Sequence, residues 1–498
     1  MSDRVSSRHE GDLGGRFLPF GDVNRVGVTV EVAPECASLP GVQHTAWMLV
    51  NLLARFKGVV HRVGVRCPEG VRVCGRVVPL AAGHEELRAS LLAGGAAVGV
   101  VPIEADTRLE WTIAVGCGDA VTGASMYACG NGWCGGVSDA PLDVDALGTP
   151  SPLPFGPYVA ACIAAGEVFK AARMRREEYI ALASAFYSVW DHGAAEAPLV
   201  GGPERLEVVL DAALAGAGAV GCALIHTLWA CPDVGGTLVI ADNDPKGLES
   251  SNLNRYALFG AGAVGQPKAT AAAQVARDAL VRWEPLDSGI ESLQLAKRRV
   301  VSAVDRNSSR AAIQLRYPAR ILSGSTLNLR AEVLRCGPPG VGACLRCFNT
   351  PETVAPDEEL RMQLQEAPDA RLAQLADSSG ITLTEAREWV STGSCGTAGE
   401  RLLPHLRRSE DERAFAVSFV SVMAGTMLAA ELIKDHLPYS GPLYASAPRG
   451  VFQFQSPLAR SNRASAYGRD PKCPMCDPST LACQTWADRY KRLMPDRR

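Results

Sequence analysis

The stretch from Leu214 to Pro245, LAGAGAVGCALIHTLWACPDVGGTLVIADNDP, constrains the fold more than any other part of this 498-residue sequence. An apolar run leads into three glycines, Gly216, Gly218 and Gly221, and a helix-like segment and a second apolar run ending at Asp242 follow. This order predicts a nucleotide-binding α/β unit whose helix N-terminus receives a phosphate. The alternative is a glycine-rich turn without a ligand. Taken alone, an acid that can bond ribose hydroxyls favours NAD over ATP.

A second set of polar residues shifts this interpretation toward ATP. Asn252, Arg255 and Lys268 follow the second predicted strand, and a later apolar strand in VVSAVDRNSSR ends in Asp305. A dinucleotide dehydrogenase has no need for an arginine and a lysine there, whereas a site that neutralises a transferring α-phosphate does. An acid at the carboxyl end of a strand is well placed for Mg²⁺. Each residue alone is typical of a charged surface, but the ordered set indicates an ATP site.

The motifs GAGAVG, DND, SNLNR and QPKA together resemble the adenylation domain of ubiquitin-activating enzymes. They are also similar to the bacterial adenylyltransferases that activate sulfur-carrier proteins, and the resemblance covers roughly residues 205–480. It implies that the nucleotide is ATP and that the acceptor is the C-terminal glycine carboxylate of a ubiquitin-like protein. It further implies that Asp242 binds ribose, that Asn252, Arg255 and Lys268 contact the phosphates, and that Asp305 serves Mg²⁺.

Two C-x-x-C pairs predict a metal site. They are Cys344 with Cys347 and Cys473 with Cys476, and Cys483 is a spare candidate. Four thiolates make a closed tetrahedral Zn²⁺ site of the structural kind, which would tie the C-terminal segment to the middle of its domain. The resembled family carries such a zinc. The alternative is four ordinary core cysteines.

Cys395 is the candidate nucleophile. It lies in STGSCGTAGE, whose Gly, Ser and Thr residues predict an exposed flexible loop, and basic residues follow from Arg401 to Arg408. Nearby positive charge favours the reactive thiolate. The resemblance implies a thioester acceptor at this position, because relatives carry their catalytic cysteine in a crossover loop before the last long helix. The alternative is an unreactive thiol, as in relatives that only adenylate. The insert 351–393 is interpreted as a small cysteine domain or a partner-docking arm.

The first half of the chain starts with a similar pattern but without the glycine loop. Strand, helix and strand are expected from Val26 to Val65, and glycine-rich loops around Cys117–Gly136. Two long small-residue helices, one in each half, align so that Glu167 matches Glu431 and Lys170 matches Lys434. This alignment predicts an internal repeat of two α/β halves. The alternative is two unrelated alanine-rich core helices.

The expected fold is therefore α/β, with two Rossmann-like halves forming a pseudo-dimer and a zinc-tied C-terminal segment. The resemblance implies an inactive copy fused to an active one, as in eukaryotic ubiquitin-activating enzymes. In that family an N-terminal arginine reaches the ATP phosphates; Arg16 is the nearest match here, with Arg25 behind it, although the glutamine that accompanies the family's arginine is missing. The expected division is a flexible arm at 1–20, an inactive domain at 21–195, an active domain at 205–350 and 396–480, an insert with the catalytic cysteine at 351–395, and a C-terminal helix at 481–498.

The predicted function is ATP-dependent adenylation of a ubiquitin-like protein, thioester formation on Cys395 and transfer to a conjugating enzyme. The plan resembles the activating enzyme of bacterial ubiquitination-like operons linked to phage defence. One alternative is a sulfur-carrier adenylyltransferase without a thioester, and another is a non-catalytic or NAD-dependent nucleotide-binding protein. Whether the chain dimerises further stays open.

Composition excludes other classes of function. The net charge of −3 gives no basic field for nucleic acid, and no long uncharged apolar run predicts a membrane span. The polar N-terminus lacks the apolar core of a signal peptide, so a cytoplasmic location is expected. In that compartment the 16 cysteines are expected to be thiols or metal ligands rather than disulfides.

Overall fold

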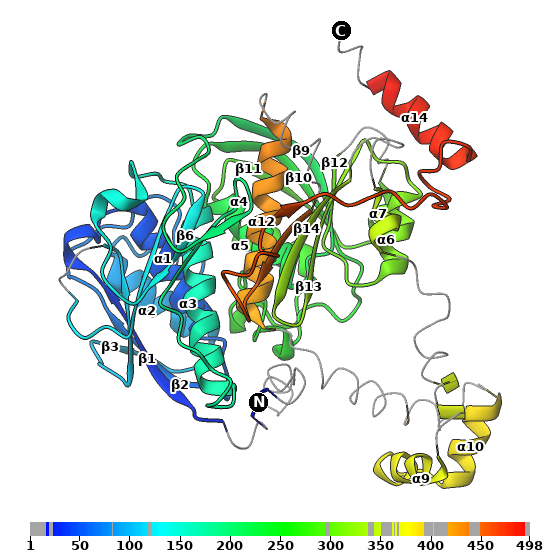
Figure 1. The fold of residues 1–498 in the computed structure, drawn as a ribbon, viewed down its shortest axis with the longest axis horizontal. Helices are drawn as coiled ribbons and strands as arrows, with labels where there is room; N and C mark the ends of the chain where they lie inside the picture. Colours follow the sequence, from blue (N-terminus) through cyan, green and yellow to red (C-terminus); the bar gives the residue numbers. More distant parts are fainter. Residues whose placement is uncertain are drawn as a thin grey trace.

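Two eight-stranded sheets, one in each half of the chain, form the framework of a computed structural model (Figure 1). The structure describes residues 16–18, 23–81, 83–117, 121–293, 299–336, 343–349, 361–362, 364–365, 368–392, 402, 417–437 and 449–493. The first sheet contains β1 (Val26–Val32), β2 (Val60–Arg66), β3 (Ile103–Ala105), β4 (Trp111–Val115), β5 (Met126–Asn131), β6 (Cys134–Ser138), β7 (Ser184–Ser188) and β8 (Gly193–Ala195). The second contains β9 (Val208–Ala215), β10 (Val234–Ala241), β11 (Val281–Leu286), β12 (Arg299–Ser302), β13 (Arg320–Leu327), β14 (Arg330–Cys336), β15 (Arg449–Gln453) and β16 (Ala464–Ser465).

The two sheets have the same topology. The strand orders are β3-β2-β1-β4-β5-β6-β7-β8 and β11-β10-β9-β12-β13-β14-β15-β16, which differ only by the offset in numbering. In the first sheet the pairs from β3 to β5 are parallel and those from β5 to β8 antiparallel. The second sheet repeats this pattern strand for strand. This agreement confirms the expected pair of Rossmann-like α/β halves.

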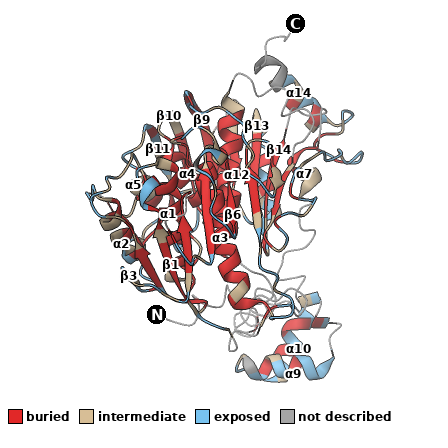
Figure 2. Ribbon diagram, turned by 60° about the vertical axis from the view of Figure 1, so that its left-hand side comes forward, coloured by how far each residue is buried: buried red, intermediate tan, exposed pale blue. Residues whose placement is uncertain are grey.

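One long helix in each half corresponds to one in the other half among the helices that the structure describes. The described helices are α1 (Pro40–Leu53), α2 (Leu87–Val98), α3 (Phe155–Arg173), α4 (Ala219–Ala230), α5 (Lys268–Val275), α6 (Asn307–Gln314), α7 (Leu345–Phe348), α9 (Asp369–Ser378), α10 (Leu383–Thr392), α12 (Ser418–His436) and α14 (Leu481–Leu493). The helices α3 and α12 have 19 residues each, contact one another and are buried along the centre of the molecule (Figure 2). Each contains a buried ion pair at the aligned positions, Glu167 with Lys170 and Glu431 with Lys434.

One apolar core runs through both halves. At its centre the rings of Phe56, Phe169 and Phe419 contact one another with centroids 5.5 to 5.9 Å apart. Phe56 and Phe169 come from the first half and Phe419 from the second. Because removing a buried Phe side chain costs about 3–5 kcal/mol, this shared cluster stabilises the contact between the two halves.

A buried polar network also crosses the seam between the halves. Glu431 on α12 is fully buried and lies 2.7 Å from His192 Nε2, which comes from the turn between β7 and β8. Arg335 Nη1 donates to the other carboxylate oxygen at 2.7 Å. Burial alone would raise the pKa of Glu431, but Lys434 and Arg335 hold it well below its ordinary value. The network therefore keeps a carboxylate charged inside the core, because Lys434 and Arg335 of the second half compensate its charge, while His192 of the first half hydrogen-bonds to it.

Two expectations about local structure are wrong. The predicted glycine-rich loops around Cys117–Gly136 contain β5 and β6. Glycines are needed in β6 because α3 packs directly against the strand, and a Cβ atom at Gly135 would lie 1.8 Å from the carbonyl oxygen of Gly156. The strand expected to end at Asp305 instead ends at Ser302, so Asp305 lies in the loop before α6.

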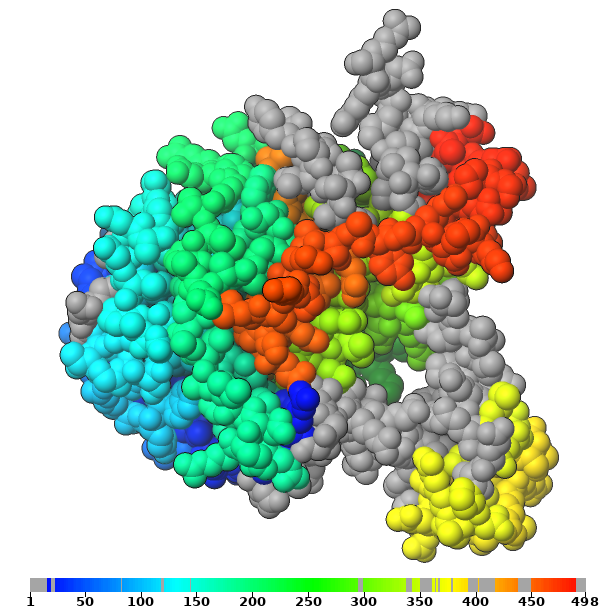
Figure 3. Space-filling view, viewed as in Figure 1, coloured from blue at the N-terminus to red at the C-terminus, as the bar shows by residue number. Residues whose placement is uncertain are grey.

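The helices α9 and α10 lie apart from the body of the molecule (Figures 1 and 3). They form a small core of their own, in which Leu372 and Ala376 of α9 lie with Ala386 and Trp389 of α10. The described part of the insert is therefore a helical hairpin. No helix in the described part of the chain is long and apolar enough to cross a membrane.

Candidate active site

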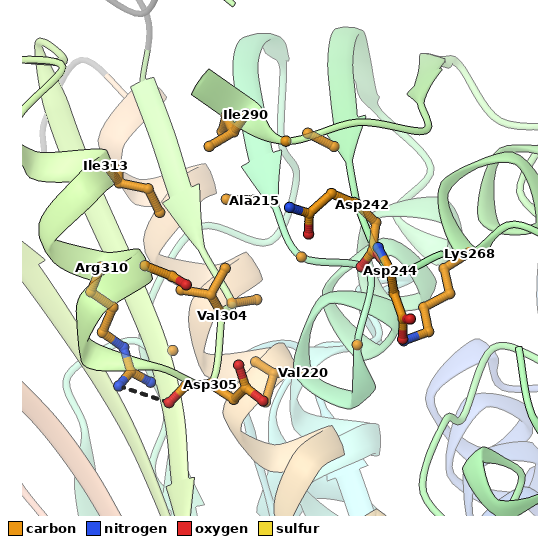
Figure 4. A pocket seen from close by; sticks show the side chains of 18 of the residues that line it. Ala215, Val220, Asp242, Asp244, Lys268, Ile290, Val304, Asp305, Arg310 and Ile313 are labelled. Atoms are coloured by element: carbon orange, nitrogen blue, oxygen red, sulfur yellow. Dashed lines mark hydrogen bonds and ion pairs between the residues drawn. The ribbon is translucent and has the colours of Figure 1, made fainter. Parts of the chain in front are cut away.

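A cavity of about 720 Å³ lies at the carboxyl ends of β9, β10 and β12 in the second half (Figure 4). The strand β9 has β10 on one side and β12 on the other. The chain therefore leaves β9 and β12 in opposite directions across the sheet. In open parallel sheets a crevice opens at such a switch point, and ligands bind there. The loop between β9 and α4 forms the floor of this cavity.

The three glycines of the GAGAVG motif, in this loop and the first turn of α4, have different roles. Gly216 has a φ of 93°, which only glycine adopts readily, and a Cβ atom at Gly221 would lie 2.0 Å from the carbonyl oxygen of Gly216. The fold itself therefore requires these two. At Gly218, which has a φ of −74°, a Cβ atom would find only the Tyr256 hydroxyl, 3.7 Å away. The open space above Gly218, at the start of α4, suits a phosphate group.

Asp242 lies beside the glycine loop at the end of β10. Its Oδ2 accepts a hydrogen bond from the Ala217 N–H at 2.7 Å, and its Oδ1 accepts one from the Asp244 N–H at 3.1 Å. These bonds fix the carboxylate at the cavity wall, with lone pairs left for a ligand. Its position is compatible with the predicted contact to ribose.

Lys268 is the first residue of α5 and contributes a nearly buried cation to the cavity. Its Nζ lies 2.5 Å from Asp244 Oδ2 and 5.7 Å from the centroid of the Tyr256 ring. Burial alone would lower the pKa of Lys268, but Tyr256, Asp244 and Asp242 outweigh it and raise the pKa. The ammonium group therefore remains charged. Asp244 has no role in the sequence-based prediction, although it is the second acid of the DND motif.

Arg255 lines the cavity, whereas Asn252 does not. The Arg255 guanidinium carbon lies 5.6 Å from the centroid of the Tyr256 ring. Asn252 is buried behind the wall, where its Oδ1 accepts a hydrogen bond from the Glu249 N–H at 3.0 Å and caps the turn Ser250–Asn252. The structure thus gives Asn252 a role in shaping the segment, and its predicted phosphate contact stays a prediction.

Asp305 and Arg310 lie on the opposite side of the cavity from Lys268 (Figure 4). Asp305 is exposed, and Arg310 Nη1 donates to Asn307 Oδ1 at 2.7 Å and to the Asp305 carbonyl at 3.4 Å. Ile290 and Ile313 add an apolar surface that suits a flat base. Arg310 is a lining residue that was not predicted from the sequence, where the available signal was its place in the helix that follows Asp305.

Arg16 does not line the cavity. Its Nε lies 3.7 Å from Glu178 Oε2, and the neighbouring Leu18 N–H bonds the Arg173 carbonyl at the end of α3. Arg25 is exposed and is likewise absent from the lining. Neither arginine lines the cavity, and the contact of Arg16 with the ATP phosphates stays a prediction.

The first half has a smaller cavity at the equivalent place, beside α1 and the ends of β1 and β4. Its volume is about 160 Å³, and its lining includes Cys36, Cys117 and Cys129. None of the described residues that line it is a lysine or an arginine. The described lining therefore offers no positive side chain to a phosphate.

The four predicted metal ligands converge. The Sγ atoms of Cys344, Cys347, Cys473 and Cys476 all lie within 4.8 Å of one another. Three of the separations are 3.8, 3.6 and 3.4 Å. Four sulfurs bound at about 2.3 Å to one tetrahedral zinc ion lie about 3.8 Å apart, so this donor set fits Zn²⁺. Cys483 is buried nearby but is not one of the four.

The cysteine cluster attaches α14 to the second half. Trp486 on α14 is buried against the cysteines, and its Nε1 donates to the Pro318 carbonyl at 2.9 Å. Arg489 Nη1 donates to the Arg316 carbonyl at 3.0 Å. A metal ion here would fix the C-terminal segment to α7, which begins directly after Cys344 and contains Cys347.

Cys395 lies outside the described residues, as do the basic residues predicted near it. Its role as nucleophile therefore remains a prediction from the sequence.

Comparison with known proteins shows which family the second half of the chain resembles. The model of the ThiF family matches residues 200–475. The uncharacterized protein y4jF of Sinorhizobium fredii is 26% identical over 355 residues, which is 62% of this chain and 64% of that protein.

Two similar solved structures are of E. coli MccB. The structure with MccA-N7isoASN has a TM-score of 0.35 and 16% identity, and the match covers 54% of this chain and 66% of that one. The structure with ATP has a TM-score of 0.34 and 17% identity, with 53% and 66% covered. The matches thus span slightly less than two thirds of the length of these relatives.

Proposed function

The chain belongs to the ThiF family, and from the cavity of its second half we propose that it uses ATP to adenylate a carboxylate. One observation carries this proposal. The cavity combines the open position at Gly218, on a helix N-terminus, with two cationic side chains, Arg255 and Lys268. A helix N-terminus can bind the phosphates of either nucleotide, but two fixed cations suit a polyphosphate undergoing transfer better than they suit a hydride cofactor.

In the proposed reaction a carboxylate oxygen attacks the α-phosphorus of ATP. The bond from that phosphorus to the oxygen bridging to the β-phosphate breaks, and the electron pair leaves with pyrophosphate, giving an acyl-adenylate. Lys268 and Arg255 stabilise the charge that develops on the phosphate oxygens. Asp244 holds the Lys268 ammonium in place, and Asp242 accepts hydrogen bonds from the ribose.

Asp305 is the residue that we propose to hold Mg²⁺. It is an exposed carboxylate at the cavity, a hard oxygen donor of the kind that this ion prefers. A bound Mg²⁺ would neutralise phosphate charge. Arg310 adds a guanidinium on the same side of the cavity, within reach of the same polyphosphate.

The substrate that we propose is the C-terminal glycine of a ubiquitin-like protein. Family membership and the resemblance of the motifs support this choice. In the second step the Cys395 thiolate attacks the acyl carbon, a thioester forms and AMP leaves, after which a conjugating enzyme accepts the acyl group by thiol exchange. The fused two-half plan supports a bacterial ubiquitination-like pathway linked to phage defence. A sulfur-carrier adenylyltransferase would stop before the thioester.

Pyrophosphate exchange into ATP tests the proposal. Wild-type protein should exchange labelled pyrophosphate when Mg²⁺ and a ubiquitin-like protein are present. Lys268→Met should abolish exchange, because it removes the buried cation. Lys246→Met is the matched control, since Lys246 is exposed and does not line the cavity. Wild-type exchange in Lys268→Met would overturn the assignment.

A further inference from the structure

Two side chains of the first half bond the backbone of the segment that carries Arg255. Asn51 lies on α1, Arg55 lies just after its end, and both are fully buried. Arg55 Nη1 donates to the Leu253 carbonyl at 2.7 Å, and its Nη2 donates to the Phe259 carbonyl at 2.8 Å. The first half, which lacks a glycine loop, thus hydrogen-bonds to the backbone of a segment that lines the cavity of the second half.

Asn51 completes this arrangement. Its Nδ2 donates to the Ala257 carbonyl at 2.8 Å, and its Oδ1 accepts from Arg55 Nε and Nη2 at 3.0 and 2.8 Å. Three carbonyls in the stretch 253–259 are therefore bound by two side chains that also bond each other. Because every acceptor in the segment is a backbone atom, these bonds set the path of the chain and not the placement of one side chain.

Burying the charged guanidinium of Arg55 costs free energy, which argues that this side chain does more than fill space. All of its acceptors are neutral oxygens, and burial lowers the pKa of its guanidinium to about 9, so it is still charged at neutral pH. A buried charge bound only by neutral groups is costly to maintain. A simple packing role could be filled by an apolar side chain, whereas holding two separated carbonyls needs the planar, multi-donor guanidinium.

The bonded carbonyls bracket the residues that face the cavity. Arg255 lies between Leu253 and Ala257, and Tyr256 follows it with its hydroxyl toward Gly218. A backbone shift in this stretch moves both side chains relative to the glycine loop. A misplacement of about 1 Å lowers the efficiency of a preorganised site up to about a hundredfold.

We infer that Arg55 and Asn51 are positioning residues for Arg255, through which the first half sets the phosphate-binding geometry of the second. This inference deepens the proposed function and rests on it for the role of Arg255. It gives the first half a defined part in ATP binding although it lacks a glycine loop.

Arg76 offers a matched control. It is also an arginine of the first half that bonds backbone carbonyls of the second, with Nε 2.5 Å from the Trp229 carbonyl and Nη2 2.5 Å from that of Cys231. These carbonyls lie at the end of α4 away from the cavity. Arg76→Lys therefore loosens the seam between the halves without touching the segment 253–259.

The first measurement is amide hydrogen exchange of the full chain. Arg55→Lys keeps the charge but cannot bond both carbonyls. The amides of residues 253–259 should therefore exchange about tenfold faster than in wild type, while the amides of the core exchange at the wild-type rate. Arg76→Lys should leave these amides unchanged. Equal protection of the segment in Arg55→Lys and wild type would overturn the inference, whether or not the protein adenylates anything. Should Arg55→Lys fail to fold, Asn51→Ser removes the bond to the Ala257 carbonyl and the two bonds with Arg55, and the same amides should exchange faster than in wild type.

The second measurement separates positioning from stability through ATP binding. Introduced alone, Arg55→Lys should weaken the affinity for ATP about tenfold. Introduced into a protein that already carries Arg255→Ala, it should cause no further loss of affinity. Arg76→Lys should leave the affinity unchanged in both. Full additivity of Arg55→Lys with Arg255→Ala would contradict positioning through Arg255. If wild type binds no ATP, the proposed function fails, and the exchange result above still decides the inference.

Discussion

Gly218→Ala is expected to weaken ATP binding without harming the fold. The backbone at Gly218 has a φ of −74°, which any residue adopts, and an added Cβ atom would meet only the Tyr256 hydroxyl at 3.7 Å. Alanine lowers the conformational entropy of the unfolded chain, which stabilises the folded protein by about 0.4–1 kcal/mol. At the N-cap of a helix, however, alanine is less favourable than glycine by a similar amount. The free energy of unfolding should therefore change by less than about 1 kcal/mol.

The same methyl group occupies the space that we assign to phosphate. Displacing the phosphate loses one hydrogen bond to a charged group, worth about 1.5–3 kcal/mol. The affinity for ATP should fall by about ten- to a hundredfold, since about 1.4 kcal/mol corresponds to a factor of ten. Gly221→Ala provides the contrast, because its Cβ atom would lie 2.0 Å from the Gly216 carbonyl oxygen and cost about 1–3 kcal/mol of stability.

Thermal melts with and without ATP, together with calorimetric titration of ATP, measure both effects. Gly218→Ala should melt like wild type but show little stabilisation by ATP, and Gly221→Ala should melt lower before any ligand is added. A Gly218→Ala protein that binds ATP as wild type does would refute the placement of the phosphate over this residue.

Three further predictions follow from the structure. Cys476→Ser should lose one zinc per chain by elemental analysis and lower the melting temperature; a metal-free wild type would contradict this. Cys395→Ala should lose a reductant-sensitive adduct with the ubiquitin-like partner yet keep pyrophosphate exchange; wild type that exchanges but never forms the adduct supports the sulfur-carrier alternative. Burial lowers the pKa of His44 and His192 to about 4 and of His226 to about 3. The unfolded chain takes up these protons near pH 6.5, so stability should be level above that pH and fall by up to about 1.4 kcal/mol per pH unit per histidine toward pH 4. A melting temperature that stays constant from pH 7 to 4.5 would count against this.

The fold was predictable because its signals are local. Strand, glycine loop and helix appear within one stretch of sequence, and the alignment of Glu167 with Glu431 points to a repeated unit. The strands β5 and β6 were missed because their glycines, typical of loops, are needed for the close approach of α3.

The details of the site depend on side-chain contacts that the spacing of motifs does not reveal. Asn252 matches a motif, but its side chain caps its own turn, and this follows from local backbone geometry that spacing does not reveal. Arg310 reaches the cavity only because α6 begins directly after Asp305. Arg55 acts on carbonyls about two hundred residues away, so no local pattern indicates its role.

Mass spectrometry of the intact ubiquitin-like partner tests the central claim most directly. The partner is incubated with ATP, Mg²⁺ and the Cys395→Ala variant, which is expected to adenylate but not to remove the acyl group. The account predicts that the partner gains the mass of one adenylate on its C-terminal glycine, and that Lys268→Met prevents this gain. A C-terminus that stays unmodified while the cavity binds NAD in place of ATP would contradict it.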